Sequence, residues 1–257
     1  MSGGPARWSA RAGFFDYRPP AVECDEWHVN FADPRLFCAY SGPLLAQDEL
    51  QVAEHPALAA VREALEPMGQ AQTEDREGAT PVLVAGVERR CALATGPNRA
   101  AGRPRGLYGN AFALAKPEVV RAAVQPQNPP TRSNILAIAA PVGHGRYSAR
   151  QIEGIARTAF AGFSAARLES KSARAVVHTG FWGCGAFGGN RVLMTALQAL
   201  AAQMAGVEVV FHWGDEAGEA PANEGARLAA SSAHGEVAAV IQELAGMGFE
   251  WGVSDGN

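Results

Sequence analysis

"RAVVHTGFWGCGAFGGNRVLMTALQALAAQMAG", residues 174–206, contains in succession a strand pattern, a glycine-rich loop and a helix pattern. Residues 174–180 form a short apolar run, which is typical of a buried strand. Residues 190–206 have the spacing of a helix, with Asn190 as its expected N-cap and Gly206 as its expected C-cap. We expect one face of that helix to carry four apolar side chains, Leu193, Leu197, Leu200 and Met204.

Similar patterns recur along the chain. Short apolar runs predict further strands over residues 27–31, 81–87, 134–140 and 207–213. Helical spacing predicts helices over residues 57–65, 147–166 and about 236–248. The stretch 98–133 is rich in Gly, Pro and Arg and is predicted to be mostly loop. Strands that alternate with helices indicate an α/β sheet covered on both faces.

Composition narrows the class of protein. The chain has 257 residues, 47% hydrophobic and 19% charged, with a formal net charge of -4 and no basic block. We therefore expect no nucleic-acid partner, because binding to phosphate backbones needs clustered Lys and Arg. No apolar run has the length of a membrane span and no secretory leader is evident, so we expect a cytoplasmic protein without membrane contact.

The cysteines and histidines are scattered. The four cysteines lie far apart, without a C-x-x-C pair, at Cys24, Cys38, Cys91 and Cys184. The six histidines show no metal-ligand spacing either, so the sequence indicates neither a metal site nor a disulfide framework. Reduced thiols fit the cytoplasmic expectation.

The loop "GCGAFGGN", residues 183–190, allows two interpretations. A glycine-rich turn between a strand and a helix exposes N–H groups to a phosphate or diphosphate, and the helix N-terminus adds a positive dipole end. Phe181, Trp182 and Phe187 could then offer flat apolar surface to a sugar or base. Alternatively, the loop is a tight crossover whose rings enter the core. The spacing alone does not decide between them.

A second informative stretch follows the predicted strand 27–31. Polar Asn30 and Asp33 lie at the strand's end, and residues 47–49, Gln-Asp-Glu, open an apparently helical segment. Two adjacent carboxyl groups that are both confined repel each other, so one pKa should rise and that group could serve as a general acid. The alternative is a solvated first helical turn, where acidic side chains favour the helix N-terminus.

Together, these two stretches resemble the poly(ADP-ribose) glycohydrolase family. One family signature is T-G-x-W-G-C-G-x-F-G-G-D, and residues 179–190, "TGFWGCGAFGGN", differ only at the last position. Another runs V-D-F-A-N, three glycines, Q-E-E; the corresponding residues are "VNFAD" (29–33), "FCA" (37–39) and "QDE" (47–49). Segments 146–163 and 209–215 also look like family segments.

The resemblance implies a fold and an activity. It implies a macrodomain-like mixed sheet in a three-layer α/β/α arrangement, as one catalytic domain over residues 1–257, with 1–26 as an N-terminal extension. It also implies a glycosidase that cleaves the ribosyl C1 bond of an ADP-ribose-type conjugate. The expected partner is a small-molecule or conjugated ribosyl-phosphate substrate; neither cofactor nor metal is expected, and the oligomeric state is not predicted.

The resemblance also implies residue roles. Glu49 matches the family's catalytic acid, which protonates the leaving oxygen, and Asp48 matches a residue that holds the ribose. Gln47 matches the family glutamine. The diphosphate cradle corresponds to Gly183, Cys184, Gly185, Ala186, Phe187 and Gly188, with Phe187 against the distal ribose. Tyr108 and Trp213 are further candidates for lining the adenine.

Three departures from the family pattern bear on the substrate. Asn30 and Asp33 exchange the amide and the carboxylate of the signature, and Asp48 is one methylene shorter than glutamate. The three glycines are replaced by residues 37–39, and we expect Phe37 to fill space beside the ligand. Two alternatives therefore remain: hydrolysis of a small NAD-derived or ribose-5-phosphate N- or O-glycoside in specialised metabolism, and a non-catalytic ADP-ribose-binding module.

Overall fold

A six-stranded mixed sheet forms the centre of the molecule in the computed structural model, which describes residues 7–20, 22–233 and 235–254. The strand order is β1-β6-β5-β2-β4-β3, and all neighbours are parallel except the antiparallel pair β3–β4. The strands are β1 (Trp8–Arg11), β2 (Asp25–Ala32), β3 (Val82–Leu93), β4 (Val124–Ala139), β5 (Ala175–Gly180) and β6 (Glu208–His212).

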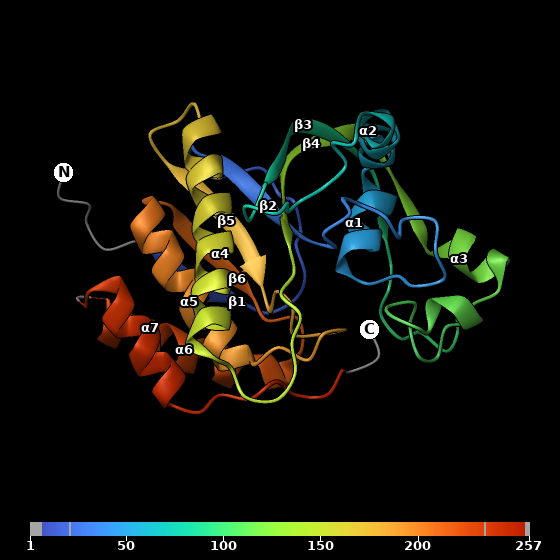
Figure 1. Cartoon of the computed structure of the whole chain (residues 1–257). Helices are drawn as coiled ribbons and strands as arrows, with labels where there is room; N and C mark the ends of the chain where they lie inside the picture. Colours follow the sequence, from blue (N-terminus) through green and yellow to red (C-terminus); the bar gives the residue numbers. More distant parts are fainter. Residues whose placement is uncertain (1–6, 21, 234, 255–257) are drawn as a thin grey trace.

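Helices lie on both sides of this sheet, which confirms the predicted α/β class with its mixed sheet and macrodomain-like layers (Figure 1). One side carries α4 (Ala149–Glu169), α5 (Arg191–Ala205), α6 (Glu219–Ser232) and α7 (Val237–Gly246). The other side carries α1 (Gln47–Glu54), α2 (Ala57–Leu65) and α3 (Pro117–Ala123). Short 3-10 turns occur at Glu66–Met68, Phe112–Leu114 and Glu216–Gly218.

The two faces of the central strands bury different kinds of side chain, one apolar and one polar. Because side chains alternate along a strand, Trp27 and Val29 of β2 face the apolar core that α4 and α5 cover. On the opposite face, β2 presents His28 and Asn30, which are also buried. A polar layer therefore lies under the half of the molecule that holds the cavity.

The strand–loop–helix unit has the predicted caps. The Asn190 side chain accepts a hydrogen bond from the backbone N–H of Leu193 at 3.1 Å, and Gly206 ends α5 with a left-handed φ of 68°. Leu193 and Leu197 are fully buried as expected, whereas Met204 is 56% exposed. The predicted apolar face is thus correct for the first turns of α5 and wrong at its last turn.

Residues 98–133 are not mostly loop, contrary to the sequence-based expectation. They contain α3 and the first part of β4, residues 124–133, which pairs with β3 alone. The partner β2 joins β4 only at residues 134–139, so the prolines of the earlier part lie on a strand with one free edge. An edge strand tolerates proline because no ladder hydrogen bond is lost there.

Two elements form where the sequence predicted no helix or strand: β1 near the N-terminus and α6 in the C-terminal part of the chain. β1 lies within the predicted N-terminal extension and pairs with β6 at one edge of the sheet. Helix α6 was not predicted, because Pro221 and Gly225 interrupt its pattern. A Cβ on Gly225 would lie 2.5 Å from the carbonyl oxygen of Val192, so this glycine permits the close packing of α6 on α5.

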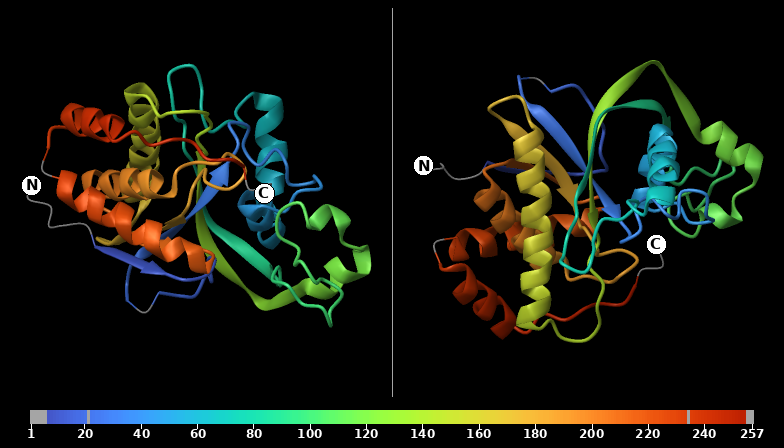
Figure 2. Two further views of the ribbon diagram at one scale, coloured as in Figure 1. Left: turned by 90° about the horizontal axis from the view of Figure 1, so that it is seen from below. Right: turned by 45° about the horizontal axis from the view of Figure 1, so that its top comes forward.

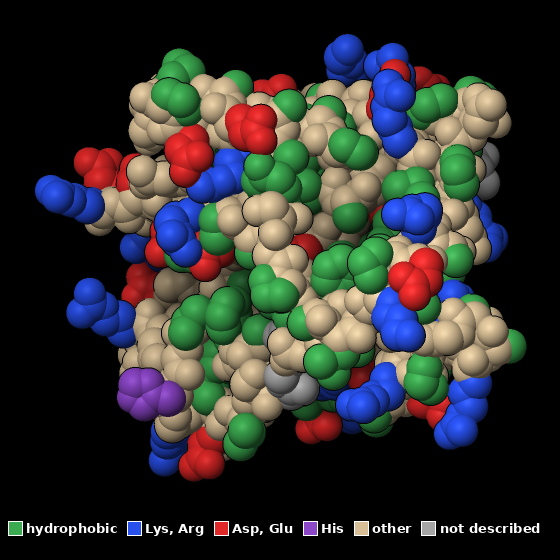
Figure 3. Space-filling view, turned by 90° about the vertical axis from the view of Figure 1, so that its right-hand side faces the viewer, with side chains coloured by type: hydrophobic (Ala, Val, Ile, Leu, Met, Phe, Trp, Pro, Cys, Tyr) green, Lys and Arg blue, Asp and Glu red, His purple; other side chains and the backbone are tan. Residues whose placement is uncertain are grey.

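Within the described part of the chain, no helix is both long and apolar enough to span a membrane. The face on the side of α1 and α3 carries its Lys and Arg side chains dispersed among acidic and apolar ones (Figure 3).

Candidate active site

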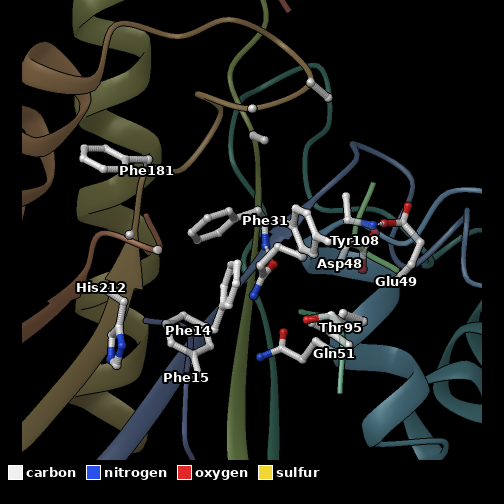
Figure 4. Close-up of a pocket in the computed structure, with 18 of the residues that line it drawn as sticks. Phe14, Phe15, Phe31, Asp48, Glu49, Gln51, Thr95, Tyr108, Phe181 and His212 are labelled. Carbon is white, nitrogen blue, oxygen red and sulfur yellow. Dashed lines mark hydrogen bonds between the residues drawn. The ribbon is translucent and has the colours of Figure 1, made fainter. Parts of the chain in front are cut away.

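A cavity of about 710 Å³ opens at the carboxyl ends of β2, β5 and β6. This is where ligands bind in open α/β sheets. Helix α1 forms one wall, the loop after β5 forms another, and aromatic side chains of the N-terminal segment lie between them (Figure 4).

The first turn of α1 is fastened to the end of β2 by two side chains. The Gln47 amide accepts from the backbone N–H of Phe31 at 2.8 Å and donates to the carbonyl oxygen of Val29 at 2.9 Å. Asn30, fully buried, donates from Nδ2 to Asp48 Oδ1 at 3.0 Å. Gln47 and Asn30 therefore position α1, although we predicted both as substrate contacts; Gln47 also lines the cavity.

Asp48 and Glu49 both line the cavity and are both buried, with 8% and 6% exposure. Oε2 of Glu49 accepts a hydrogen bond from the backbone N–H of Ala46 at 3.0 Å, in the manner of a capping box. The interpretation of these residues as a solvated helix turn is therefore wrong. The fold withdraws the two adjacent carboxyl groups from water.

Burial is the main reason that both carboxyl groups hold their protons more tightly. It raises the pKa of Asp48 to about 7, with the charge of Glu49 adding to the effect and the hydrogen bond from Asn30 opposing it. Burial also raises the pKa of Glu49, against the stabilising backbone N–H groups of Ala46 and of Glu49 itself. Each group can thus be protonated at a higher pH than an exposed carboxyl.

We expect the stability gain of the Asp48→Asn variant over the wild type to be larger at about pH 8 than at about pH 4, by roughly 1–3 kcal/mol. The folded pKa of Asp48 is raised from 3.8 to about 7, so wild-type stability falls as pH rises through this window. Asparagine carries no charge to desolvate. Urea unfolding at both pH values measures the difference, with exposed Asp75→Asn as the control. An equal gain at both pH values would contradict the expectation.

Most glycines of the loop after β5 are required by neighbouring protein atoms. A Cβ on Gly180 would lie 2.6 Å from the carbonyl oxygen of His212, and one on Gly183 would lie 2.8 Å from Pro141 Cδ. At Gly188 the obstacle is the carbonyl oxygen of Gly252, at 2.5 Å, and at Gly189 it is that of Gly183, at 2.7 Å. The tight-crossover interpretation therefore accounts for these four glycines.

The C-terminal segment causes one of these restrictions. Gly252 donates to the carbonyl oxygen of Gly188 at 2.6 Å, and Trp251 stacks on Tyr147 with 4.4 Å between ring centroids. The Tyr147 hydroxyl in turn accepts from the backbone N–H of Asn190 at 2.9 Å. Residues 250–254 thus run alongside the loop and support it (Figure 2).

The same loop still presents a surface to the cavity. Five predicted contacts line it, Gly183, Cys184, Gly185, Ala186 and Phe187. Trp182 and Gly188 are buried away from it, and Trp182 is part of the main apolar core. The expectation that these two line the site is therefore corrected. The loop combines both interpretations: a crossover on its inner side and a cavity wall on its outer side.

Phe37 does not fill the cavity. Its side chain is fully buried in a second apolar cluster with Leu36, Val52 and Leu58. Its φ of 49° is in the left-handed region that favours glycine, so the backbone keeps a conformation suited to the family's glycine loop. Of residues 37–39, only Cys38 and Ala39 line the cavity. Asp33 lines it as well. The predicted steric role of Phe37 is wrong.

Aromatic rings line the cavity from several elements. Tyr108 and Trp213 do so as expected, and Tyr108 contacts Phe14 with 5.3 Å between centroids. The sequence analysis missed the contributions of the N-terminal segment, including Phe14 and Phe15. No local signal marked these rings, because β1 and β6 bring them to the cavity by pairing over a long sequence separation.

Arg191 is a further cavity residue that was not predicted from the sequence. Its guanidinium lies 4.7 Å from the ring centroid of Phe181 and donates to both carboxylate oxygens of Asp215, at 3.3 and 3.1 Å. All three residues line the cavity. A cation directly after a glycine-rich loop, at the first residue of a helix, was the available signal for an anion site.

One known protein family matches part of the chain. Residues 103–219 match the family described as poly(ADP-ribose) glycohydrolase (PARG), macro domain fold. This segment includes the loop after β5 but not Asp48 and Glu49. No curated protein matches the chain significantly in sequence.

Solved structures of similar fold include two bacterial poly(ADP-ribose) glycohydrolases. The enzyme from Thermomonospora curvata, bound to the inhibitor ADP-HPD, is 18% identical with a TM-score of 0.52, over 80% of this chain and 71% of the other. The enzyme from Deinococcus radiodurans, in complex with ADP-ribose, is 15% identical with a TM-score of 0.45, over 81% and 75% of the two chains. At 18% identity, the likeness to the Thermomonospora curvata enzyme concerns the fold.

The resemblance seen in the sequence is thus confirmed for residues 103–219, which match the poly(ADP-ribose) glycohydrolase family, and the fold of the chain is similar to that of the Thermomonospora curvata enzyme.

Proposed function

We propose that this protein hydrolyses the ribosyl C1 glycosidic bond of an ADP-ribose-type conjugate, with Glu49 as the general acid. One observation carries the proposal: two adjacent buried carboxyl groups with raised pKa values face a cavity of about 710 Å³, which the family's loop lines from another side. Cavities of several hundred Å³ are typical of sites for ligands of nucleotide size.

Glu49 is oriented for proton transfer. Because Oε2 is held by the Ala46 N–H, Oε1 is the oxygen left to meet a leaving group in the cavity. A protonated Glu49 donates its proton to the oxygen that departs from C1 as an oxocarbenium-like ribose forms; water then attacks C1 and gives a proton back to the Glu49 carboxylate. Asp48, held by Asn30, is placed to hold a ribose hydroxyl beside it.

The phosphates are assigned to the wall opposite these acids. The N–H groups of Cys184, Gly188 and Gly189 donate to carbonyl oxygens within the loop, so residues 185–187 would present N–H groups to an anion. Arg191 supplies the neighbouring positive charge at the N-terminus of α5. A diphosphate would replace Asp215 as its partner. Phe187 lies beside the same wall for contact with a ribose.

The aromatic side of the cavity is assigned to the base. Phe14 and Tyr108 contact each other at its edge, and Trp213 lies nearby in the lining. An adenine ring could stack against such a surface at small entropic cost, since aromatic side chains have few rotatable bonds. This assignment extends the proposed role of Tyr108 and Trp213 to Phe14.

Two other functions compete with this one. Cys38 and Ala39 line the cavity where the family signature has glycine, which favours a smaller ribosyl phosphate or NAD-derived glycoside. A non-catalytic ADP-ribose-binding module is disfavoured, because a binding protein has no need of two buried acids whose desolvation costs stability.

Binding of ADP-ribose tests the phosphate assignment. We expect Arg191→Gln to weaken the affinity for ADP-ribose roughly 10–100-fold, as when a charge-assisted contact to phosphate is lost. Isothermal titration calorimetry measures it, with Arg157→Gln as a matched control, since Arg157 is 76% exposed on α4. An unchanged affinity would refute the assignment. Binding of ribose 5-phosphate without binding of ADP-ribose would favour the smaller substrate.

A further inference from the structure

Three histidines lie side by side on the polar face of the central strands. His28 of β2 is directly opposite His178 of β5, and their rings stack with 4.5 Å between centroids. His212 of β6 follows at 5.4 Å from His178. Glu26 precedes His28 by two residues, so its side chain leaves β2 on the same face. Four residues from three distant segments of the chain thus meet on three adjacent strands.

Among the described residues, three ring nitrogens of this cluster are buried without a hydrogen-bond partner: Nδ1 of His28, Nε2 of His178 and Nδ1 of His212. The first two belong to residues that are each 3% exposed and lie nearest to Glu26. Burying a polar atom without a partner costs free energy, so such atoms call for an explanation. Oε1 of Glu26 lies 3.4 Å from Nε2 of His178, and one ligand atom from each of the three residues lies within 4.8 Å of the others.

The second ring nitrogens of His178 and His28 are engaged in a way that suits metal ligands. Nδ1 of His178 lies 3.1 Å from Nε2 of His212. If His178 is the donor of that bond, its Nε2 carries a lone pair directed toward Glu26. His28 has a backbone hydrogen bond with Asn134. Metal-bound histidines characteristically donate their second N–H to such an acceptor, which fixes the tautomer.

We propose that Glu26, His28 and His178 bind one divalent first-row transition-metal ion. Two imidazoles and one carboxylate are a common donor set for zinc and for iron(II), and three protein ligands leave a coordination position open. Metal–ligand distances of about 2.0–2.2 Å require the donors to approach each other more closely. Glu26, whose side chain is 19% exposed, can move toward the rings, and the two stacked imidazoles must tilt so that their lone pairs meet at the ion.

The site is separate from the two carboxyl groups but connected to the cavity. Phe15 and Tyr17 cover the histidines, with ring centroids 5.5 Å and 4.5 Å from that of His28. His212, the hydrogen-bond partner of His178, lines the cavity. The ion would therefore join β2 to β5 beneath the N-terminal segment and fix the orientation of His212 at the cavity wall.

Metal titration of the full chain tests the proposal. After removal of bound metal with a chelator, cobalt(II) is added and its visible absorption followed; zinc(II) is then added to displace it. We expect one equivalent of cobalt in a low-symmetry site, and a rise in melting temperature with zinc. Glu26→Gln should weaken cobalt binding at least roughly tenfold, because it removes a ligand while nearly preserving shape.

The control is His144→Gln, since His144 is exposed and lies outside the cluster. It should bind cobalt as the wild type does. Nitrogen-15 chemical shifts of the imidazoles give a second readout that needs no variant: zinc should shift Nδ1 of His28 and Nε2 of His178 but leave His55, whose two ring nitrogens already have partners. Absence of binding by the wild type, or equal binding by Glu26→Gln, would overturn the proposal.

Discussion

Glu49→Gln should lower kcat for an ADP-ribosyl substrate by roughly 10²–10⁴-fold while leaving the affinity for ADP-ribose almost unchanged. Glutamine keeps an oxygen that can accept the Ala46 N–H, so the first turn of α1 should be preserved. It has no acidic proton to give to the leaving oxygen. Release of ribose products, measured together with ADP-ribose binding by calorimetry, separates loss of chemistry from loss of binding.

The matched control for this variant is Glu77→Gln, which makes the same change at an exposed residue outside the cavity. It should have wild-type turnover. Full turnover by Glu49→Gln would show that Glu49 is not the acid. Because Glu49 must be protonated to act, wild-type kcat should also fall as pH rises through its raised pKa. Wild-type protein that binds ADP-ribose but releases no product would favour the non-catalytic module instead.

The second large effect concerns stability: Glu54→Gln should lower the free energy of unfolding by about 3–5 kcal/mol. Oε2 of Glu54 accepts from Nε and Nη2 of Arg89, both at 2.8 Å, and Oε1 accepts from the backbone N–H of Leu93 at 2.8 Å. The two side chains are only 7% and 11% exposed. Glutamine would leave the Arg89 charge buried without its counter-charge and would turn an amide N–H toward Leu93 or Arg89.

This ion pair also supports the cavity wall. The Arg89 guanidinium lies 4.6 Å from the ring centroid of Tyr17, whose hydroxyl accepts from Gln51 Nε2 at 3.0 Å. We therefore expect the variant to loosen the N-terminal segment and to bind ADP-ribose more weakly as well. Urea unfolding gives the stability, and near-ultraviolet circular dichroism reports the packing of the aromatic side chains.

Glu66→Gln is the comparison for this prediction. Glu66 pairs with Arg62 at 2.6 Å, one helical turn apart, but its side chain is 61% exposed. Loss of an exposed pair of this kind should cost less than about 1 kcal/mol. Similar losses of unfolding free energy in the two variants would mean that burial does not increase the contribution of the Glu54–Arg89 ion pair to stability.

Local sequence signals were sufficient for elements whose pattern and caps agree. The Asn190 side-chain cap and the left-handed Gly206 of α5 formed where the sequence placed them. Local sequence signals failed where contacts with distant segments decide which secondary structure forms. Residues 124–133 become a strand because β3 pairs with them, and α6 forms because Gly225 fits closely against α5. Neither partner can be read from the segment itself.

The candidate site shows the same division. The motif containing Asp48 and Glu49 and the loop 183–187 were identified from sequence, and the structure brings them to one cavity. Phe37 was misplaced, because the direction of a side chain at a positive φ depends on the core behind it. Arg191 and the N-terminal rings were missed, since only the folded sheet brings them to the cavity.

By itself, the sequence determined the α/β class, the strand–loop–helix unit and the family resemblance, because periodicity, caps and motifs are local properties of the chain. The tertiary structure decided which glycines face protein, how deeply the two acids are buried, and that Glu26, His28 and His178 meet. Those outcomes depend on contacts between distant segments. Desolvation, close approach and metal geometry exist only once the strands have been paired and the sheet has been covered.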